Sequence, residues 1–149
     1  MKIPNTMDTR NRPAAEIIDD LRAMKGCKLA VLGSLNIDAA ASAAAIHVHQ
    51  KSIIAMIGWH PVRLITGCRP VGAEKAARLA AKRFTGKLAA VIHRAEITYG
   101  IRTADMMANM IIEQASDALL ILTSGPAVCD LLRARFEQNG KKVFEIEIS

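Results

Sequence analysis

The sequence predicts an α/β protein with a single doubly wound, Rossmann-like domain and a mostly parallel sheet of about five strands. Two patterns lead to this fold class. Short and nearly all-apolar runs, typical of buried strands, alternate along the chain with longer alanine-rich stretches that are free of helix breakers. Because the apolar runs lack polar alternation, we expect helices to cover both faces of the sheet. Right-handed crossovers between parallel strands then give the doubly wound arrangement.

The bulk composition is that of one folded domain. The chain has 149 residues, of which 51% are hydrophobic and only 3% aromatic, so Ala, Ile, Leu, Val and Met must build the core. We expect residues 1–27 to form an N-terminal arm with a short helix, and residues 28–149 to form the Rossmann-like domain. No repeat, linker or low-complexity tract suggests a second domain.

The amino-terminal half holds three predicted elements. A helix over AAEIIDDLRAM begins after Pro13, a residue that favours helix starts. The run KLAVLGS at 28–34 ends in Gly and Ser, which indicates a buried strand followed by a turn. The alanine-rich run at 36–57 predicts a long helix that Asn36 caps. Its small side chains allow close helix packing, and a homodimer is one arrangement that would use them.

The alternation of strand and helix continues through the rest of the chain. Further strands are predicted at 62–67, 87–94 and 117–124, and further helices at 72–84, 101–116 and 127–139. Gly140 follows the last helix as a C-cap. The final segment, KVFEIEIS at 142–149, alternates in polarity as an edge strand with one wet face does.

Charge alone leaves the choice of partner open. The net charge of +6 and the pI of about 9.6 allow a nucleic acid, because clustered Lys and Arg release counterions from its phosphates. Most single-strand binders add aromatic stacking platforms, however, and this chain has one Trp, one Tyr and three Phe. Solvated helix faces explain the scattered basic residues as well.

The cysteines and the apolar runs indicate a cytoplasmic protein without membrane contact. Cys27, Cys68 and Cys129 are odd in number and far apart, so they predict neither a disulfide framework nor a metal knuckle. His47 and His49 point about 200° apart on a helix, which is poor geometry for sharing one metal ion. The start of the chain lacks the apolar core of a signal peptide, and no apolar run reaches membrane-spanning length. We expect no metal and no cofactor.

The turns after the strands hold the candidate ligand-binding residues. Parallel strands end at one edge of the sheet, where small residues let backbone amides approach an anion and helix N-termini face it. On this basis the predicted ligand-binding residues are Gly33, Ser34, Gly67, Cys68, Arg69, Gly72, Glu74, Arg102, Ser124 and Gly125. Neither G-x-G-x-x-G nor G-x-x-x-x-G-K-[ST] occurs, which disfavours the common NAD and ATP enzymes. No catalytic residue is assigned.

The stretch TGCRPVGAEKAARLAAKRF at 66–84 resembles the glycine-rich turn and following helix of the YspA and YpsA-related branch of the SLOG superfamily. Glu74 stands where that branch has the acid of an H-G-G-A-x-G-A-D-like turn. The stretch MMANMIIEQASDALLIL is similar to the family's helix-to-strand passage, with Asn109 and Asp117 at matching positions and Ala108 where an arginine is expected. Arg102 is the candidate to replace that arginine. The resemblance covers about residues 28–148.

The resemblance implies a protein that binds a nucleotide or nucleotide-derived ligand and senses it without catalysis. Two alternatives come from more distant members of the superfamily. A nucleic-acid-binding module of the DprA type would contact phosphates through Lys75, Arg78, Lys82 and Arg83 of one helix. A LOG-type nucleoside monophosphate phosphoribohydrolase carries P-G-G-x-G-T-x-x-E after the fourth strand. This chain has SGPAVCDLL there, with Gly125 as the glycine and Asp130 near the position of the acid.

Overall fold

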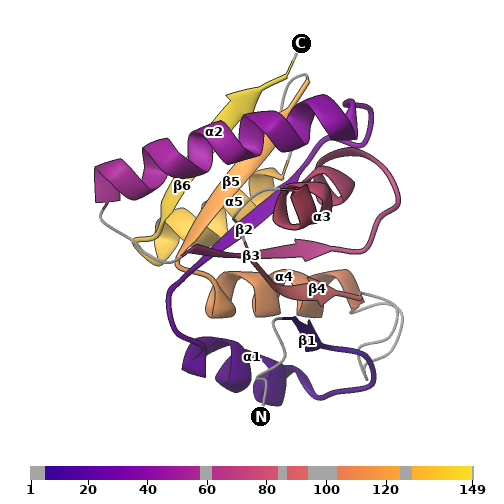
Figure 1. The fold of residues 1–149 in the computed structure, drawn as a ribbon. Coiled ribbons are helices and arrows are strands. Elements are labelled where there is room, and N and C mark those ends of the chain that lie inside the picture. The colour runs from indigo at the N-terminus through magenta and orange to yellow at the C-terminus, as the bar shows by residue number, and fades with distance from the viewer. Residues whose placement is uncertain (1–5, 58–61, 84–86, 94–103, 125–128, 149) are drawn as a thin grey trace.

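The computed structural model describes residues 6–57, 62–83, 87–93, 104–124 and 129–148, and it shows a sheet between two layers of helices (Figure 1). The strands are β1 (Met7–Asp8), β2 (Cys27–Gly33), β3 (Val62–Gly67), β4 (Lys87–Ile92), β5 (Ala118–Thr123) and β6 (Lys142–Glu147). The helices are α1 (Ala14–Ala23), α2 (Ala39–Ile57), α3 (Gly72–Arg83), α4 (Ala104–Ala115) and α5 (Asp130–Gln138). The α/β class is therefore confirmed.

The sheet has six strands in the order β1-β4-β3-β2-β5-β6, and every pair is parallel. From β2 the chain moves outward through β3 and β4, then returns to the other side of β2 to add β5 and β6. This reversal of direction is the mark of the doubly wound, Rossmann-like fold that the sequence predicts. The reversal falls between the neighbouring central strands β2 and β5, so a crevice is expected at their carboxyl ends.

The sequence prediction of about five strands missed β1. This strand has two residues, which is too short for any periodic signal. It pairs with β4 through Met7↔Ala90 and Asp8↔Val91, and the Thr9 hydroxyl donates to the Val91 carbonyl at 2.7 Å. The N-terminal segment thus extends the sheet. Its separation from the domain at residue 27 stays a prediction.

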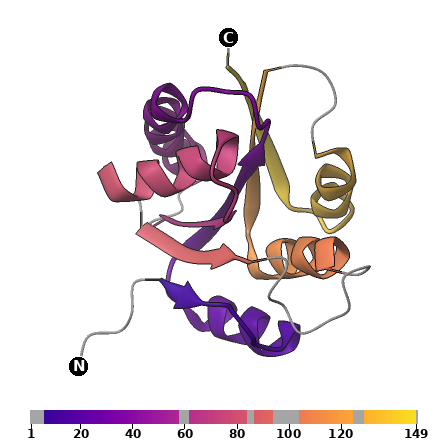
Figure 2. The same cartoon turned by 90° about the vertical axis from the view of Figure 1, so that its right-hand side faces the viewer.

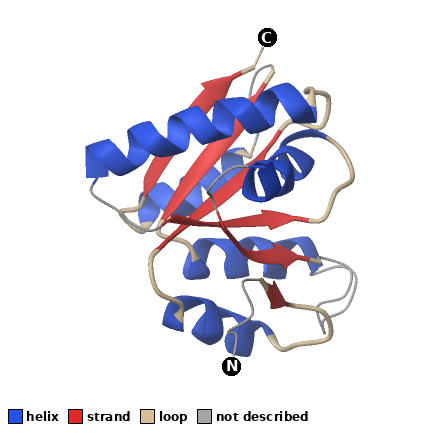
Figure 3. Cartoon of the chain, in the orientation of Figure 1, coloured by secondary structure: helices blue, strands red, loops and turns tan. Residues whose placement is uncertain are grey.

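Helices cover both faces of the sheet, α2 and α3 on one and α1, α4 and α5 on the other (Figures 2 and 3). The strands alternate between these two cores with the period of two that a pleated strand imposes. Ala30 and Leu32 of β2 face the α4 side, whereas Leu29 and Val31 face the α2 side. All four are essentially inaccessible to solvent. This explains why the central strands appear in the sequence as unbroken apolar runs.

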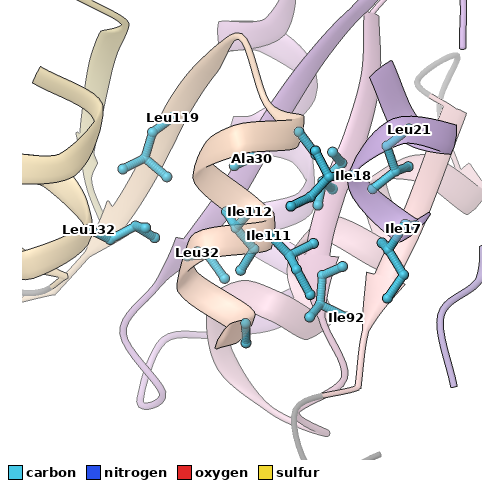
Figure 4. Close-up of a cluster of buried hydrophobic side chains, with 14 of the residues drawn as sticks. Ile17, Ile18, Leu21, Ala30, Leu32, Ile92, Ile111, Ile112, Leu119 and Leu132 are labelled. Atoms are coloured by element: carbon cyan, nitrogen blue, oxygen red, sulfur yellow. The ribbon is translucent and has the colours of Figure 1, made fainter. Parts of the chain in front are cut away.

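The core on the α4 side is built from branched aliphatic side chains of α1, α4, β2, β4 and β5 (Figure 4). Ile17 and Leu21 of α1 pack in the same cluster as Ile111 of α4 and Ile92 of β4. The N-terminal helix is therefore part of the core. At about 25 cal/mol for each Å² of apolar surface removed from water, fully buried side chains of this size contribute about 1.5–3 kcal/mol each.

The alanines explain the packing on the other face. Ala73, Ala76, Ala77 and Ala80 of α3 are fully or almost fully buried in one cluster with Ala43 and Ile46 of α2. Small side chains let the two helix backbones approach each other within one chain. The alanine-rich composition thus has a role that needs no second subunit, and the homodimer stays a prediction. In the described part of the chain, no helix has the length and apolar character to cross a membrane.

Helix and strand boundaries follow the predictions closely, with one error of capping. The strand at 62–67 and the left-handed Gly140, at φ +71° after α5, are confirmed. Asn36 as the cap of the long helix is wrong, because α2 begins at Ala39 and the Asp38 carboxylate accepts from the amides of Ala40 and Ala41 at 2.9 and 3.3 Å. The residues flanking α4 and α5 at 101–103 and 127–128, and the predicted strand end at residue 94, lie outside the described residues.

Replacing the observed cap should destabilise the protein more than replacing the predicted one. Asp38→Ala removes the acceptor for two amides at the start of α2 and should cost about 1 kcal/mol of unfolding free energy. Asn36→Ala removes one exposed hydrogen bond and should cost about 0.5 kcal/mol or less. Urea denaturation of the two variants measures both values, and equal losses would contradict the assignment of Asp38 as the cap.

Candidate functional site

A cavity of about 390 Å³ lies at the carboxyl edge of the sheet, where the strand order reverses between β2 and β5. It is lined by Leu32, Gly33, Leu35, Arg69, Glu74, Asn109, Cys129, Asp130, Leu131 and Leu132. Three of the predicted ligand-binding residues, Gly33, Arg69 and Glu74, are in this set. Asn109 and Asp130, which the family resemblance singled out, also line the cavity. The volume is within the range of small-molecule sites.

Gly33 lets the two central strands approach each other at the floor of the site. Its φ is +153°, and a Cβ atom built there would lie 1.9 Å from the Leu122 carbonyl oxygen. Directly after it, the Ser34 amide donates to the same carbonyl at 2.8 Å. A side chain at residue 33 would push β5 away from β2 at the point where the cavity begins. The glycine is therefore required by close packing of the backbone.

Gly72 makes a second close approach, between the start of α3 and the turn that follows β2. Its φ is +72°, and an added Cβ atom would lie 2.4 Å from the Ser34 carbonyl oxygen and 2.6 Å from the Leu35 Cα. The next amide, that of Ala73, donates to the Ser34 carbonyl at 2.9 Å. The predicted turn at 66–74 is thus bonded to the turn after β2. Both turns form one wall of the site.

Two charged side chains hold the turn before α3 in shape. The Glu74 side chain is only 5% exposed, and its Oε1 accepts from the Arg69 amide at 3.3 Å while Oε2 lies 3.4 Å from the Arg69 Nε. Arg78, one turn further along α3, donates to the carbonyls of Gly67 and Arg69 at 2.6 Å each. Buried charges need such partners. The result is a turn of fixed shape that carries Arg69.

The amides of Ser34, Ala73 and Ser124 donate within the protein. Ser34 donates to Leu122, Ala73 to Ser34, and the Ser124 amide to the Ser34 hydroxyl at 3.1 Å. The Ser124 hydroxyl in turn donates to Asn36 Oδ1 at 2.8 Å. These bonds fasten the two central strand ends to each other. The capacity to bind a ligand therefore falls mainly on the side chains that line the cavity.

Arg69, Asn109 and Asp130 supply the available polar groups. Nε of Arg69 is occupied by Glu74, but its Nη1 and Nη2 atoms make no hydrogen bond or ion pair with the described residues. The side chains of Asn109 and Asp130 are also without such partners in that part of the chain. The cavity thus offers a guanidinium, an amide and a carboxylate, which come from β3–α3, α4 and α5 respectively.

The start of α5 adds a positive electrostatic contribution. The first amides of any helix have no acceptor inside the helix, and together with the peptide dipoles they favour a negative charge. No side chain of the described residues caps α5, and Cys129 precedes it in the left-handed conformation at φ +61°. That conformation is uncommon for a residue with a side chain. Asp130 and Leu131 of this first turn line the cavity.

The remaining predicted site residues lie apart from the cavity lining or outside the described residues. Gly67 ends β3 and gives its carbonyl to Arg78, and Cys68 is exposed in the following turn. Arg102 and Gly125 lie outside the described residues. Sequence reasoning missed Leu35, Leu131 and Leu132 because single apolar residues in turns and helices do not stand out from the core pattern.

The cysteines behave differently from one another. Burial raises the pKa of the Cys27 thiol to about 12, so this side chain stays protonated and packs in the core on the α2 side of the sheet. Cys68 is exposed, and Cys129 lines the cavity. Within the described ranges, no group of three or more His, Cys, Asp or Glu side chains is arranged to hold a metal ion.

A second cavity, of about 790 Å³, lies between β1 and α1 and reaches the start of β3. Four of the five charged side chains that line it, those of Asp8, Arg12, Asp20 and Arg63, are already paired inside the protein. Arg12 bonds to Glu16 and Asp20, and the Arg63 Nε donates to the Lys25 carbonyl at 3.0 Å. Asp8 pairs with Arg10, and this hydrogen bond lowers its pKa to about 2. The smaller cavity, with unpaired polar groups at the strand reversal, is the stronger candidate for a ligand site.

The fold and the cavity define a class of protein: a three-layer, doubly wound α/β protein with a polar cavity where its strand order reverses. Comparisons of the chain with models of protein families, with curated proteins and with solved structures found no match. The likeness to the SLOG superfamily therefore stays a prediction.

Two reasons for a glycine at residue 72, the close backbone contact and the left-handed conformation, can be tested separately by comparison with Gly140. Gly140 has nearly the same φ, +71° against +72°, but an added Cβ atom meets nothing within 4 Å. Gly140→Ala should therefore cost only the strain of the left-handed conformation, about 1 kcal/mol. Gly72→Ala should cost about 2 kcal/mol more, because the new methyl group strikes backbone atoms. Chemical denaturation measures both, and similar losses would show that the two turns do not need to touch.

Proposed function

We propose that the cavity binds a small nucleotide-type ligand and that Arg69 holds its anionic group. The proposal rests on one observation. A guanidinium fixed by a buried carboxylate lines a cavity at the strand reversal, together with an amide and a second carboxylate that have no partner among the described residues. Crevices at this position of doubly wound sheets are the usual ligand sites of such folds.

The arrangement of charges supports a phosphate at Arg69. Glu74 occupies Nε of the guanidinium, which leaves the Nη1 and Nη2 edge for two parallel hydrogen bonds to a planar pair of anionic oxygens. The first turn of α5 adds its dipole at the same cavity. Because the turn is already fixed by Glu74 and Arg78, little conformational entropy is lost when the anion binds.

The other polar groups support a sugar or a base next to that phosphate. The Asp130 carboxylate accepts hydrogen bonds only, so it suits hydroxyl groups such as those of a ribose. The Asn109 amide both donates and accepts. A ligand that uses all three side chains has an anion, hydroxyl groups and a neutral polar edge, which is the composition of a nucleotide. The role is binding, and no group of the cavity is assigned to a chemical step.

Removing the guanidinium should weaken the binding of AMP, the simplest probe with these groups. Arg69→Gln keeps a donor for Glu74 but removes the positive charge, and it should raise the dissociation constant about tenfold or more. Isothermal titration calorimetry at 0.15 M salt measures the change. Lys82→Gln is the matched control, because it also removes one positive charge but from the exposed last turn of α3.

The control also separates the nucleic-acid alternative. Lys75, Lys82 and Arg83 are exposed on α3, whereas Arg78 is engaged with two backbone carbonyls. If the basic helix contacts a nucleic-acid backbone, Lys82→Gln weakens the binding of a short single-stranded DNA and the affinity falls steeply with salt. If AMP binds to neither the parent protein nor the variants, the proposal of a nucleotide site is wrong.

A phosphoribohydrolase is a second candidate because two carboxylates line the same cavity. Glu74 bonds to both the amide and the guanidinium of Arg69, so Asp130 is the carboxylate available for chemistry. If the cavity hydrolyses nucleoside monophosphates, Asp130→Asn should lower the release of adenine from AMP by at least about 100-fold. Chromatography of the products measures the rate. A rate that Asp130→Asn leaves unchanged, or no release by the parent protein, contradicts this activity.

A further inference from the structure

Most of the exposed apolar side chains lie at the edge of the sheet where the cavity is found. Among the described residues, the large hydrophobic side chains that are exposed are Leu35, Val48, Val71, Met106 and Leu131. All of these except Val48 lie at the carboxyl edge of the sheet: Leu35 follows β2, Val71 precedes α3, and Met106 and Leu131 are in the first turns of α4 and α5. Single exposed apolar residues are ordinary on protein surfaces, but several of them at one edge of the sheet, two in the lining of one cavity, favour a binding surface.

Leu35 and Leu131 belong to the cavity itself. Leu35 is 47% exposed and Leu131 is 81% exposed, and both line the cavity that holds Arg69. They come from opposite sides of the sheet. Leu35 lies against the start of α3, where an added Cβ atom on Gly72 would be 2.6 Å from the Leu35 Cα, and Leu131 is in the first turn of α5 on the other face.

Contacts within the fold fix the backbone of both leucines. The backbone of Leu35 is held by the contact with Gly72 and by the Ala73 amide bonded to Ser34. Leu131 belongs to the first turn of α5, and Leu132 beside it is buried in the core. The opposite end of α5 is tied to α4, because the side-chain amide of Asn139 and the ammonium of Lys141 bond to Glu113. The backbone segments that carry the two leucines are thus fixed by the fold, while both side chains are exposed at the cavity.

We infer that Leu35 and Leu131 bind the two faces of a planar nucleobase, so that the ligand is a nucleotide and not a sugar phosphate. This inference rests on the proposed function, since it requires the phosphate at Arg69. The chain has almost no aromatic residues, and the described cavity lining has none, so aliphatic side chains must supply the apolar contact with the base. Contacts with the faces of a base do not distinguish its edges, so purine and pyrimidine nucleotides should both bind.

The test compares AMP with ribose 5-phosphate, which has the same sugar and phosphate but no base. AMP should bind at least about tenfold more tightly, because the base removes the exposed surfaces of both leucines from water. Leu131→Ser should reduce this ratio to about threefold or less while leaving the affinity for ribose 5-phosphate unchanged. The residue is 81% exposed, so the variant should fold, and an unchanged melting temperature checks this. Val48→Ser is the control, because Val48 is 61% exposed but does not line the cavity.

The outcomes distinguish the two levels of the proposal. If ribose 5-phosphate binds as tightly as AMP, or if Leu131→Ser leaves the ratio unchanged, the base is not held by these leucines and the inference is wrong, although the phosphate site stands. If neither compound binds the parent protein, the proposed function itself fails. A ratio that falls with Leu131→Ser and not with Val48→Ser supports the inference.

Discussion

The pairing of β2 with β5 is the contact on which the rest of the structure depends. These two strands are neighbours at the centre of the sheet although almost ninety positions separate them along the chain, as in the pair Leu29↔Ala118. Their close approach is possible at the carboxyl end only because residue 33 is Gly, whose missing Cβ atom would collide with the Leu122 carbonyl. The register of this pair brings the turns after β2 and β5 together. It therefore determines which side chains share the cavity.

From this pair, the packing of backbone against backbone extends to the wall of the site. The Ser34 carbonyl accepts from the Ala73 amide, and the Ser34 amide donates to the Leu122 carbonyl. A single residue of the turn after β2 therefore connects β5 with the start of α3. Gly72 allows that contact because it has no side chain. Glu74 and Arg78 then fix the turn that carries Arg69. The position of the Arg69 guanidinium thus depends on backbone contacts at Gly33 and Gly72, which bring together distant parts of the chain. The local sequence around Arg69 does not specify these contacts.

The sequence predicts the fold well because strands and helices that are buried on both faces of a sheet leave recognisable apolar patterns in one sequence. Apolar runs such as ALLILT and alanine-rich helices follow directly from burial on two faces. The misses have physical causes. β1 is too short to show periodicity. The helix α2 begins at Ala39, so Asp38 caps it, while the Asn36 side chain accepts a hydrogen bond from the Ser124 hydroxyl instead. Both depend on tertiary contacts that compete with local preference.

The candidate site was predictable in position but not in chemistry. Parallel strands bring their carboxyl ends to one edge, so Gly33, Arg69 and Glu74 could be assigned to it from their place after the strands. The use of each group depends on the partners that folding provides. The Ser34 and Ser124 amides, expected to face an anion, are taken by acceptors of the protein, while Asp130 and Leu131 reach the cavity from α5.

This division of roles has a consequence for selectivity. A site made of backbone amides accepts many anions because the amides recognise little more than negative charge and size. In this cavity the amides of Ser34, Ala73 and Ser124 serve the fold, so recognition of the proposed ligand would fall mainly to a guanidinium, a carboxylate and two aliphatic side chains. Each of these demands a different part of a ligand: an anion, hydroxyl groups and an apolar face. A ligand that lacks the anion, the hydroxyl groups or the apolar face would leave a polar group of the cavity unpaired or an apolar side chain exposed to water. Either effect would raise the dissociation constant of that ligand. The hydrogen bonds that join the two central strand ends would therefore also leave the selection of the proposed ligand to side chains.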